Sequence, residues 1–544
     1  MHRCLAVPEI LDLICGQVVE PASSIFSRGD GFMPNSTQLS TCAALARTCR
    51  IFSDTALRSL WNRQNNLEPF LGLFPSDLFA PCRRSVGGKD ARGQVWLNHV
   101  QKFARALIPV DSERALIYAP RVKQFSVDPA AWERVLKVIP MLSICSPGGF
   151  LFPQLRVLIV RSDISEPVTL RSFLPPTLER IKLSWKANIP TASLMSTLGN
   201  LCPNLKHVSV SLSAESMDSV DSTCLFLCAL HNLVSIEMNQ VPTMDALLHL
   251  GQLCTLSSLK FKSLPTASTL HAPPSTTHPL FCRLRKLEIW DVGIQPVIKF
   301  LKLFFHNASL VSINLKFSAT TRWTLAKTQS LYDTLTAACA HGSLRELELH
   351  TCAADDHAEE REQPELPGSV LRTLTCFHEL RTLFVPGLVV LDDNALNELT
   401  LSWPNMAYLV FEKSCGTSAT PSLTLKSLRI LARNCPQIWG THFDIDATEV
   451  PPAHDTRIVG NKVTSIGINS SPISEPAAVA RYLSSLFPNL EAIFTRADEF
   501  EIEDRDMDLL DSEDVERDRI WEKVRRLLPE FQQARKEEYG WGPL

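Results

Sequence analysis

The chain has 544 residues, roughly three to four times the usual size of one compact domain, so several domains or one extended repeat array is expected. With 45% hydrophobic and 21% charged residues, the composition is typical of a folded protein and excludes a collagen-like or largely disordered chain. The net charge is −4, with +1 over residues 121–490. This near-neutral middle argues against a nucleic-acid groove, which needs a sustained basic stripe.

Sixteen cysteines are spread along the chain without paired spacing, which favours reduced and mostly buried thiols over a disulfide framework. No apolar stretch has the length of a signal-peptide core or a membrane span. We therefore expect a cytoplasmic or nuclear protein, or one found in both compartments, that does not bind a membrane.

The first 62 residues predict a small helical unit. A short helix begins near Pro8, with Ile10, Leu11 and Ile14 on one apolar face. After a polar insertion over residues 21–38, a second helical stretch continues into a turn of helix capped by Asp54. Because these helices carry more apolar surface than about sixty residues can hide, a partner is expected.

This unit resembles an F-box, the adaptor-binding motif of substrate receptors in cullin-type ubiquitin ligases. The match is an order of residues: Leu5 and Pro8 with Glu9-Ile10-Leu11, then Leu45-Ala46-Arg47-Thr48-Cys49-Arg50 and Phe52, then Leu57 and Trp61. The resemblance implies docking on a Skp-type adaptor through apolar anchors in a helix-in-groove contact. The candidate adaptor-binding residues are Leu5, Pro8, Ile10, Leu11, Ile14, Leu45, Cys49, Phe52, Leu57 and Trp61. Alternatively, these side chains pack on one another or on the first repeats.

Residues 63–120 are predicted to form a helical linker or cap before the repeats, and the pattern L-x-x-L-x-L follows. Its copies begin at Val122, Leu155, Leu178, Leu205, Leu233, Leu256, Leu284, Leu310, Leu344, Leu380, Met406, Ile438, Val463 and Leu490, at intervals that cluster near 26 residues. Each copy reads as a half-buried strand, and the residues between copies often have helical apolar spacing. The pattern resembles the leucine-rich-repeat family over residues 121–495. We expect an α/β solenoid, a horseshoe with a parallel inner sheet and outer helices.

Side chains that alternate with the buried positions of the strands form the predicted inner face, the default binding surface of a solenoid. This face is mixed in charge but carries large aromatic residues where water is expected, and aromatic residues dominate interface energetics. The candidate target-binding residues are Trp290, Phe384, Tyr408, Phe494 and Arg496. An alternative is that loops or the C-terminal segment cover them.

The last segment, residues 496–544, combines an acidic run with an amphipathic helix. Twelve of the 21 residues from 498 to 518 are acidic, which is typical of a solvated segment. The following helix has an apolar side that could cap the open end of the solenoid; its residues are Ile520, Trp521, Val524, Leu527 and Leu528.

No phosphate-binding glycine loop, nucleophile elbow or metalloprotease motif is found, so neither an enzyme nor a cofactor or metal site is expected. An F-box-like unit before leucine-rich repeats resembles the architecture of ubiquitin-ligase substrate receptors. That resemblance implies a Skp-type adaptor, a cullin bound through it, and an unidentified target protein as partners. The alternative is a leucine-rich-repeat scaffold whose N-terminal helices only cap the solenoid.

Overall fold

The structure is a computed structural model, and the residues it describes form two compact units, unit 1 (Met1–Leu256) and unit 2 (Ser257–Leu544). The described residues are 7–19, 36–80, 102–127, 132, 135–160, 167–185, 189–212, 217–239, 241–271, 279–318, 321, 323–351, 365–387, 389–412, 421–452, 460, 462–469, 471–495, 498 and 512–540. Among them, no helix combines the length and apolar character that crossing a membrane requires.

The repeated motif determines the position of every strand in the main sheet after β1. The first apolar residue of each copy is at most 3% exposed, and a strand begins two residues later, as β10 (Glu346–Thr351) does after Leu344. Within a strand, buried and half-exposed residues alternate, as in β9 (Ser312–Phe317). Consecutive strands pair in parallel without a shift of register where the motif is regular. The predicted α/β leucine-rich-repeat solenoid is confirmed.

Unit 1 contains the N-terminal helices and the first strands, whose order in the sheet follows the sequence. The strands are β1 (Arg63–Gln64), β2 (Gln124–Val127), β3 (Val157–Val160), β4 (Arg180–Trp185), β5 (His207–Leu212) and β6 (Ser235–Met238). The helices are α1 (Pro8–Val19), α2 (Ser36–Thr48), α3 (Arg50–Asn62), α4 (Glu68–Leu71), α5 (Pro109–Tyr118), η3 (Ala119–Arg121), α7 (Ile139–Ile144), η4 (Pro147–Gly149), η5 (Pro167–Phe173), α8 (Ile189–Leu201), α9 (Met217–Cys228) and α10 (Met244–Gln252).

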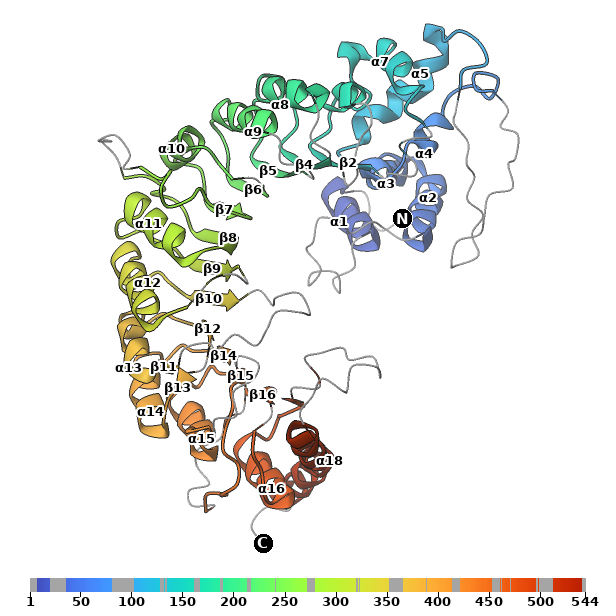
Figure 1. The fold of residues 1–544 in the computed structure, drawn as a ribbon. Helices are drawn as coiled ribbons and strands as arrows, with labels where there is room; N and C mark the ends of the chain where they lie inside the picture. The colour runs from blue at the N-terminus through green and yellow to red at the C-terminus, as the bar shows by residue number, and fades with distance from the viewer. Residues whose placement is uncertain are drawn as a thin grey trace. The chain divides into compact units, whose positions relative to one another are not determined.

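Unit 2 continues the same alternation, with α11, α12, α14 and α15 on one side of its strands (Figure 1). Besides β9 and β10, its strands are β7 (Ser258–Phe261), β8 (Lys286–Val292), β12 (Thr382–Pro386), β14 (Tyr408–Glu412), β15 (Gly440–His442), β16 (Ser465–Asn469) and β17 (Ala492–Thr495), with a separate pair, β11 (Leu366–Pro367) and β13 (Val389–Val390). The helices are α11 (Ile294–Phe304), α12 (Leu325–Ala338), α13 (Gly368–Leu371), η6 (Arg372–Cys376), α14 (Asp393–Leu401), α15 (Leu425–Asn434), α16 (Pro476–Leu486) and α18 (Ser512–Gly540).

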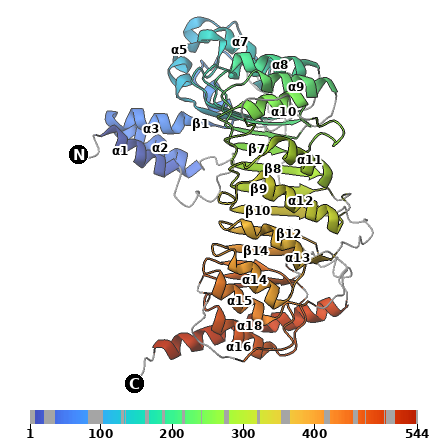
Figure 2. The same ribbon diagram turned by 90° about the vertical axis from the view of Figure 1, so that its left-hand side faces the viewer.

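The N-terminal helices α1, α2 and α3 pack together, as Figure 2 shows. Leu11 and Cys15 of α1 and Ala56 of α3 are at most 2% exposed, so they form the centre of this bundle. The third helix begins after Cys49, and Asp54 therefore lies inside α3 instead of capping a separate turn. The sequence misplaced this start because Asp54 is a strong capping residue, whereas Cys49 caps without any side-chain hydrogen bond.

Residues 63–120 are more than the predicted helical linker. They include α4 and α5, but also strand β1, which pairs in parallel with β2 and so joins the sheet. Phe79 and Phe103 form an isolated antiparallel bridge. Arg105 donates hydrogen bonds to Asp77 and to the buried Asp111, at 2.7 Å in each case. The predicted domain boundaries remain predictions.

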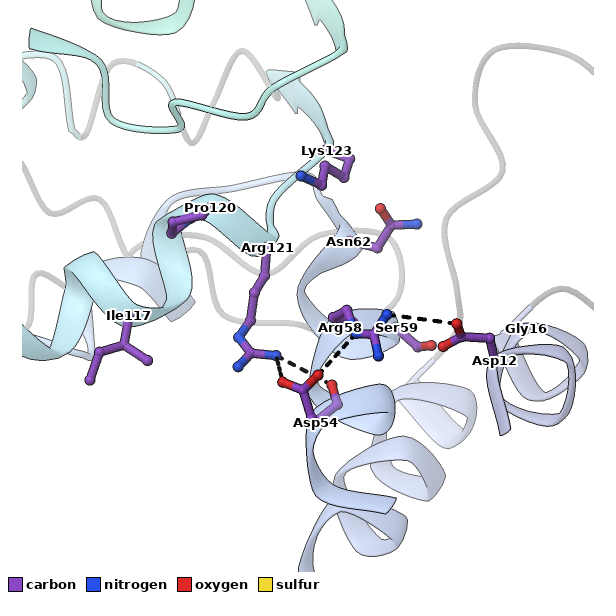
Figure 3. A pocket seen from close by; sticks show the side chains of 10 residues that line it. All are labelled: Asp12, Gly16, Asp54, Arg58, Ser59, Asn62, Ile117, Pro120, Arg121 and Lys123. Carbon is purple, nitrogen blue, oxygen red and sulfur yellow. Dashed lines mark hydrogen bonds and ion pairs between the residues drawn. The ribbon is translucent and has the colours of Figure 1, made fainter. Parts of the chain in front are cut away.

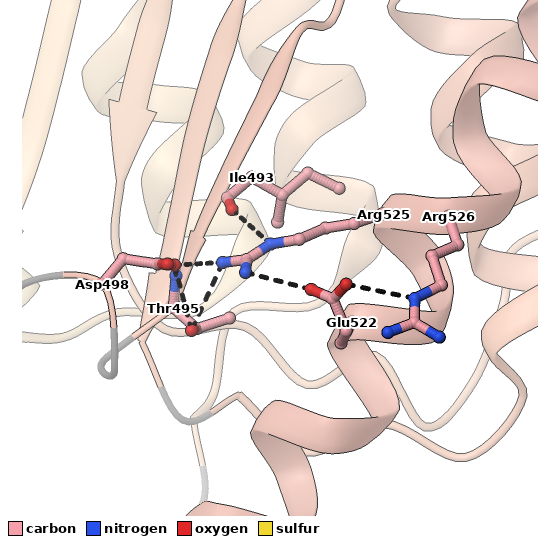
Figure 4. A network of polar contacts seen from close by, with 6 residues as sticks. All are labelled: Ile493, Thr495, Asp498, Glu522, Arg525 and Arg526. Atoms are coloured by element: carbon pink, nitrogen blue, oxygen red, sulfur yellow. Dashed lines mark hydrogen bonds and ion pairs between the residues drawn. The ribbon is translucent and has the colours of Figure 1, made fainter. Parts of the chain in front are cut away.

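The long helix α18 covers the last strand of unit 2 (Figure 4). Trp521 and Val524 are fully buried, and the Trp521 indole donates a hydrogen bond to the Ser471 carbonyl at 2.8 Å. Arg525 donates to the Ile493 carbonyl of β17 at 2.8 Å and also pairs with Asp498. Edge-strand carbonyls that lack a neighbouring strand thus receive side-chain donors. The amphipathic helix therefore acts as the predicted cap of the array.

Candidate protein-interaction surfaces

The inner face of unit 2 carries the aromatic residues that the sequence singled out. Trp290 in β8, Phe384 in β12 and Tyr408 in β14 are half-buried, while Phe494 in β17 is 46% exposed. In each of their strands, the buried motif residues alternate with residues of the opposite face. This alternation places all four aromatic side chains on the inner surface of the sheet. Arg496, the fifth candidate, lies outside the described residues.

Four ring-bearing side chains from successive repeats form a continuous row, here called the aromatic row: His350, Phe384, Tyr408 and Trp439. Neighbouring ring centroids are 4.9, 5.5 and 4.5 Å apart along this order. The last two rings are stacked, with an angle of 4° between their planes. Such distances are in the range of favourable aromatic contacts, so the row is a preorganised apolar strip.

Trp439 was missed by the sequence reasoning, although it is 46% exposed and completes the row. It lies one residue before β15, at a position outside the alternating strand pattern. The equivalent residues of two preceding repeats are Arg345 and Arg381, as the backbone hydrogen bonds between repeats show. A tryptophan at a position where no other repeat has an aromatic residue was the available signal.

A glycine makes room for the stack. A Cβ atom on Gly440 would lie 2.7 Å from Cε2 of Tyr408, closer than real Cβ contacts come. Tyr408 and Gly440 are direct register partners, so the tyrosine ring lies over the backbone of the neighbouring strand. This position brings the ring against Trp439.

Trp290 is held differently from the aromatic row. The ammonium groups of Lys260 and Lys316 lie 4.1 and 4.4 Å from the centroid of its ring. Its indole nitrogen donates a hydrogen bond to Glu288 at 2.6 Å. Cation–π contacts and this hydrogen bond fix the side chain. Trp290 therefore offers less free ring surface to a partner than Trp439 does.

The predicted adaptor-binding residues divide by burial. Leu11 and Trp61 are 2% and 8% exposed, and the Trp61 ring lies 5.0 Å from that of Tyr118. Both therefore pack internally, as the alternative interpretation expected. Ile14 is exposed, and the half-buried candidates are Ile10, Leu45, Cys49, Phe52 and Leu57. Leu5 and the side chain of Pro8 lie outside the described residues.

Three further aliphatic side chains of the three-helix bundle are exposed to solvent, and the sequence did not single them out. Val7, Leu13 and Ile51 are 39%, 69% and 49% exposed, beside 39% for Ile14. The sequence shows an apolar face on each helix but does not decide which part of it the other helices cover. Among the described residues of the three-helix bundle, these four large aliphatic side chains are exposed and available to a partner.

A cavity of about 630 Å³ lies between α1, α3 and the η3 segment (Figure 3). Arg121 pairs with Asp54 at 2.8 Å, and Arg58 lies 3.2 Å from Asp54 and 3.6 Å from Asp12. The hydrogen bond from Arg121 is the main reason that the pKa of the Asp54 carboxyl is lowered. These ion pairs connect α3 to α1 and to the η3 segment that precedes β2. Within the described ranges, no three His, Cys, Asp or Glu side chains are placed to hold a metal ion.

Comparisons with known proteins add little to this geometry. No protein-family model matches the chain, and no curated protein matches it either. One similar solved structure is the complex of Rad7 and Elc1 in yeast, at 12% identity and a TM-score of 0.29. The match covers 77% of this chain and 92% of that one. A likeness of this extent carries no argument about function.

Proposed function

We propose that the chain is the substrate-recognition subunit of a Skp-cullin-F-box ubiquitin ligase. The three-helix unit binds a Skp-type adaptor, and through it a cullin, while the inner face of unit 2 binds a target protein. The chain itself performs no catalysis and uses no cofactor, and it acts in the cytoplasm, the nucleus or both. The observation that carries this proposal is the pairing of two interaction surfaces, one aliphatic and one aromatic, on a repeat scaffold.

The adaptor half of the proposal is supported by the exposed side chains of α1 and α3. A bundle of three short helices that leaves Leu13 69% and Ile51 49% exposed has an incomplete core. A partner helix or groove that covers these residues would supply the missing apolar contacts. The matching order of residues between Leu5 and Trp61 gives the partner its expected class.

The target half is supported by the aromatic row. Tyr408 and Trp439 are stacked before any partner binds, so little side-chain entropy remains to be lost on binding. Exposed, preorganised aromatic side chains are enriched among the residues that dominate binding energy. An inner face with such a row is therefore suited to bind protein.

A leucine-rich-repeat scaffold without ligase association remains the second candidate. It is favoured by the internal contacts of the three-helix unit, because Trp61 packs against Tyr118 and Asp54 pairs with Arg121. These contacts attach α3 to the segment that precedes β2. A unit that served only as a cap would need them, whereas an adaptor-binding unit needs exposed apolar residues in addition.

The deciding experiment is capture of a purified Skp-type adaptor by the full chain and by surface variants. We expect Leu13→Glu combined with Ile51→Glu to abolish capture, because each places a charge in the apolar contact. Ile144→Glu is the matched control, since Ile144 of α7 is 74% exposed and lies in unit 1 but outside the three-helix bundle. All variants should keep the wild-type circular dichroism spectrum, as substitutions at exposed positions rarely disturb folding. No capture by the unmodified chain would favour the scaffold.

A further inference from the structure

The residues that immediately precede the strands of unit 2 form a column along one edge of the sheet. Backbone hydrogen bonds connect them in order: the amide of Arg381 donates to Arg345 at 2.7 Å, Ala407 to Arg381 at 2.7 Å, and Trp439 to Ala407 at 2.9 Å. Two guanidinium groups therefore project from adjacent repeats, about 5 Å apart at the backbone. Along the column, Arg345 and Arg381 come before Ala407 and Trp439, whose ring is exposed.

Three arginines stand in this column, and with Lys286 at the start of β8 they form what we call the basic edge: Arg285, Lys286, Arg345 and Arg381. All four are exposed. None lies within 4.0 Å of a carboxylate oxygen of a described residue, and the described acidic neighbours in the sequence, Glu346 and Glu379, are half-buried. The edge therefore carries a net positive charge that the described part of the fold does not neutralise.

The equivalent column of unit 1 shows the contrast. There Glu179 lies between two basic residues and pairs with both, with Arg156 at 3.5 Å and with Lys206 at 3.4 Å. Each of these three residues occupies the position just before a strand, as Arg345 and Arg381 do in unit 2. Glu179 thus bridges two basic residues of the unit 1 column, whereas Arg345 and Arg381 are direct neighbours in the unit 2 column with no acid between them.

We propose that the basic edge and the Tyr408–Trp439 stack together bind an acidic segment of a target protein, with an aromatic or other apolar side chain between its carboxylates. Guanidinium groups bind carboxylates through paired, charge-assisted hydrogen bonds. The exposed face of Trp439 takes the apolar side chain, since it lies two positions beyond Arg381 along the column, with only the small Ala407 between them. This inference rests on the proposed function and names the chemistry of its target.

Protein is favoured over single-stranded nucleic acid by the acidic residues of the same sheet surface. Glu288, Glu346 and Glu348 occupy positions on the inner face of β8 and β10. A phosphate backbone that followed the aromatic row would approach these carboxylates, whereas a short acidic segment can remain at the edge.

The binding test uses the full chain and labelled peptides of twelve residues. The acidic probe alternates Glu and Asp around one central Trp, and its control replaces every Glu by Gln and every Asp by Asn. We expect fluorescence anisotropy to show binding of the acidic peptide and at least about tenfold weaker binding of the amide peptide. Affinity should also fall as NaCl is raised, because exposed charges are screened.

Variants assign this binding to the basic edge. Arg345→Gln with Arg381→Gln should lower the affinity for the acidic peptide by about tenfold or more. Trp439→Ala should also lower this affinity, because the stacked ring that contacts the peptide is lost. The control is Lys426→Gln with Arg433→Gln, which removes the same charge from exposed positions of α15. We expect this control to bind the peptide like the wild type.

The proposal is overturned by equal binding of the acidic and amide peptides, by no binding of either, or by equal losses in both double variants. Tighter binding of a phosphoserine peptide without carboxylates would overturn the carboxylate assignment. Tighter binding of a twelve-residue oligothymidylate would replace protein by nucleic acid. Adaptor capture by the same preparation distinguishes the two proposals, because it does not depend on the basic edge.

Discussion

The substitution Gly440→Ala tests the geometry of the aromatic row most directly. The added Cβ would lie 2.7 Å from Cε2 and 2.8 Å from Cδ2 of Tyr408, about 0.7 Å short of the 3.4 Å at which ordinary contacts begin. The 2.8 Å contact with the Ser465 hydroxyl is relieved by a rotation of that side chain. The tyrosine ring, however, is also stacked on Trp439 and has to leave its position.

The magnitude follows from three contributions. Overpacking typically costs about 1–3 kcal/mol, and loss of the aromatic pair costs about 0.5–1.5 kcal/mol. Replacement of glycine by alanine restricts the unfolded chain and offsets about 0.4–1 kcal/mol. We therefore expect Gly440→Ala to lower the free energy of unfolding by about 2 kcal/mol, with less cost where the ring escapes into solvent.

The assay is urea unfolding in a double-mutant cycle with Tyr408→Ala, together with near-ultraviolet circular dichroism. In the Tyr408→Ala background the ring is absent, so Gly440→Ala should be neutral or slightly stabilising, with a coupling energy of about 1–3 kcal/mol. Gly342→Ala is the control, because a Cβ there meets no atom within 4 Å. Equal costs of Gly440→Ala in both backgrounds would refute the placement of the Tyr408 ring over β15.

Three other predictions concern the interior. Trp521→Ala should lower the free energy of unfolding in urea by about 3–5 kcal/mol. Trp521→Phe should lower it by only about 1 kcal/mol, because chiefly the hydrogen bond to Ser471 is lost. Equal losses in the two variants would contradict the role of packing. The fully buried Tyr332 hydroxyl finds no partner among the described residues, so Tyr332→Phe should leave the urea midpoint unchanged or raise it, and a clear fall would count against this assignment. Burial raises the thiol pKa values of Cys202, Cys339 and Cys435 to about 12. Alkylation of the native chain at pH 9 should therefore label the exposed Cys254 and Cys282 first and spare the three buried thiols until urea is added. Mass spectrometry of the labelled chain checks this order.

The repeat architecture could be predicted because each copy of the motif imposes the same burial. Leu344, Leu380 and Met406 are fully buried at the same position of successive repeats, and the strand always starts two residues later. This rule is local in sequence and is repeated many times. Both the strands and the inner-face positions therefore follow from the spacing.

The N-terminal unit was harder to predict, because burial there depends on how three helices pack. Trp61 and Leu11 read as anchors for a partner, yet both lie in the interior, while Leu13 on the same helix as Leu11 is exposed. The apolar face of a helix can be predicted from the sequence, but which of its residues a neighbouring helix covers cannot. Trp439 was missed for a related reason, because its contact with Tyr408 depends on Gly440, in the next strand.

The side-chain donors of α18 have a consequence for how such an array can change in length. Arg525 and Gln532 donate to the carbonyls of Ile493 and Leu490, so the outer edge of β17 is occupied by side chains where another strand would pair. A repeat added after β17 would have to displace this helix and leave its buried Trp521 without a site. Gain or loss of repeats is therefore tolerated within the array, because each new strand there pairs with a neighbour on both sides. Removal of α18 would instead leave an open strand edge that can pair with a second chain.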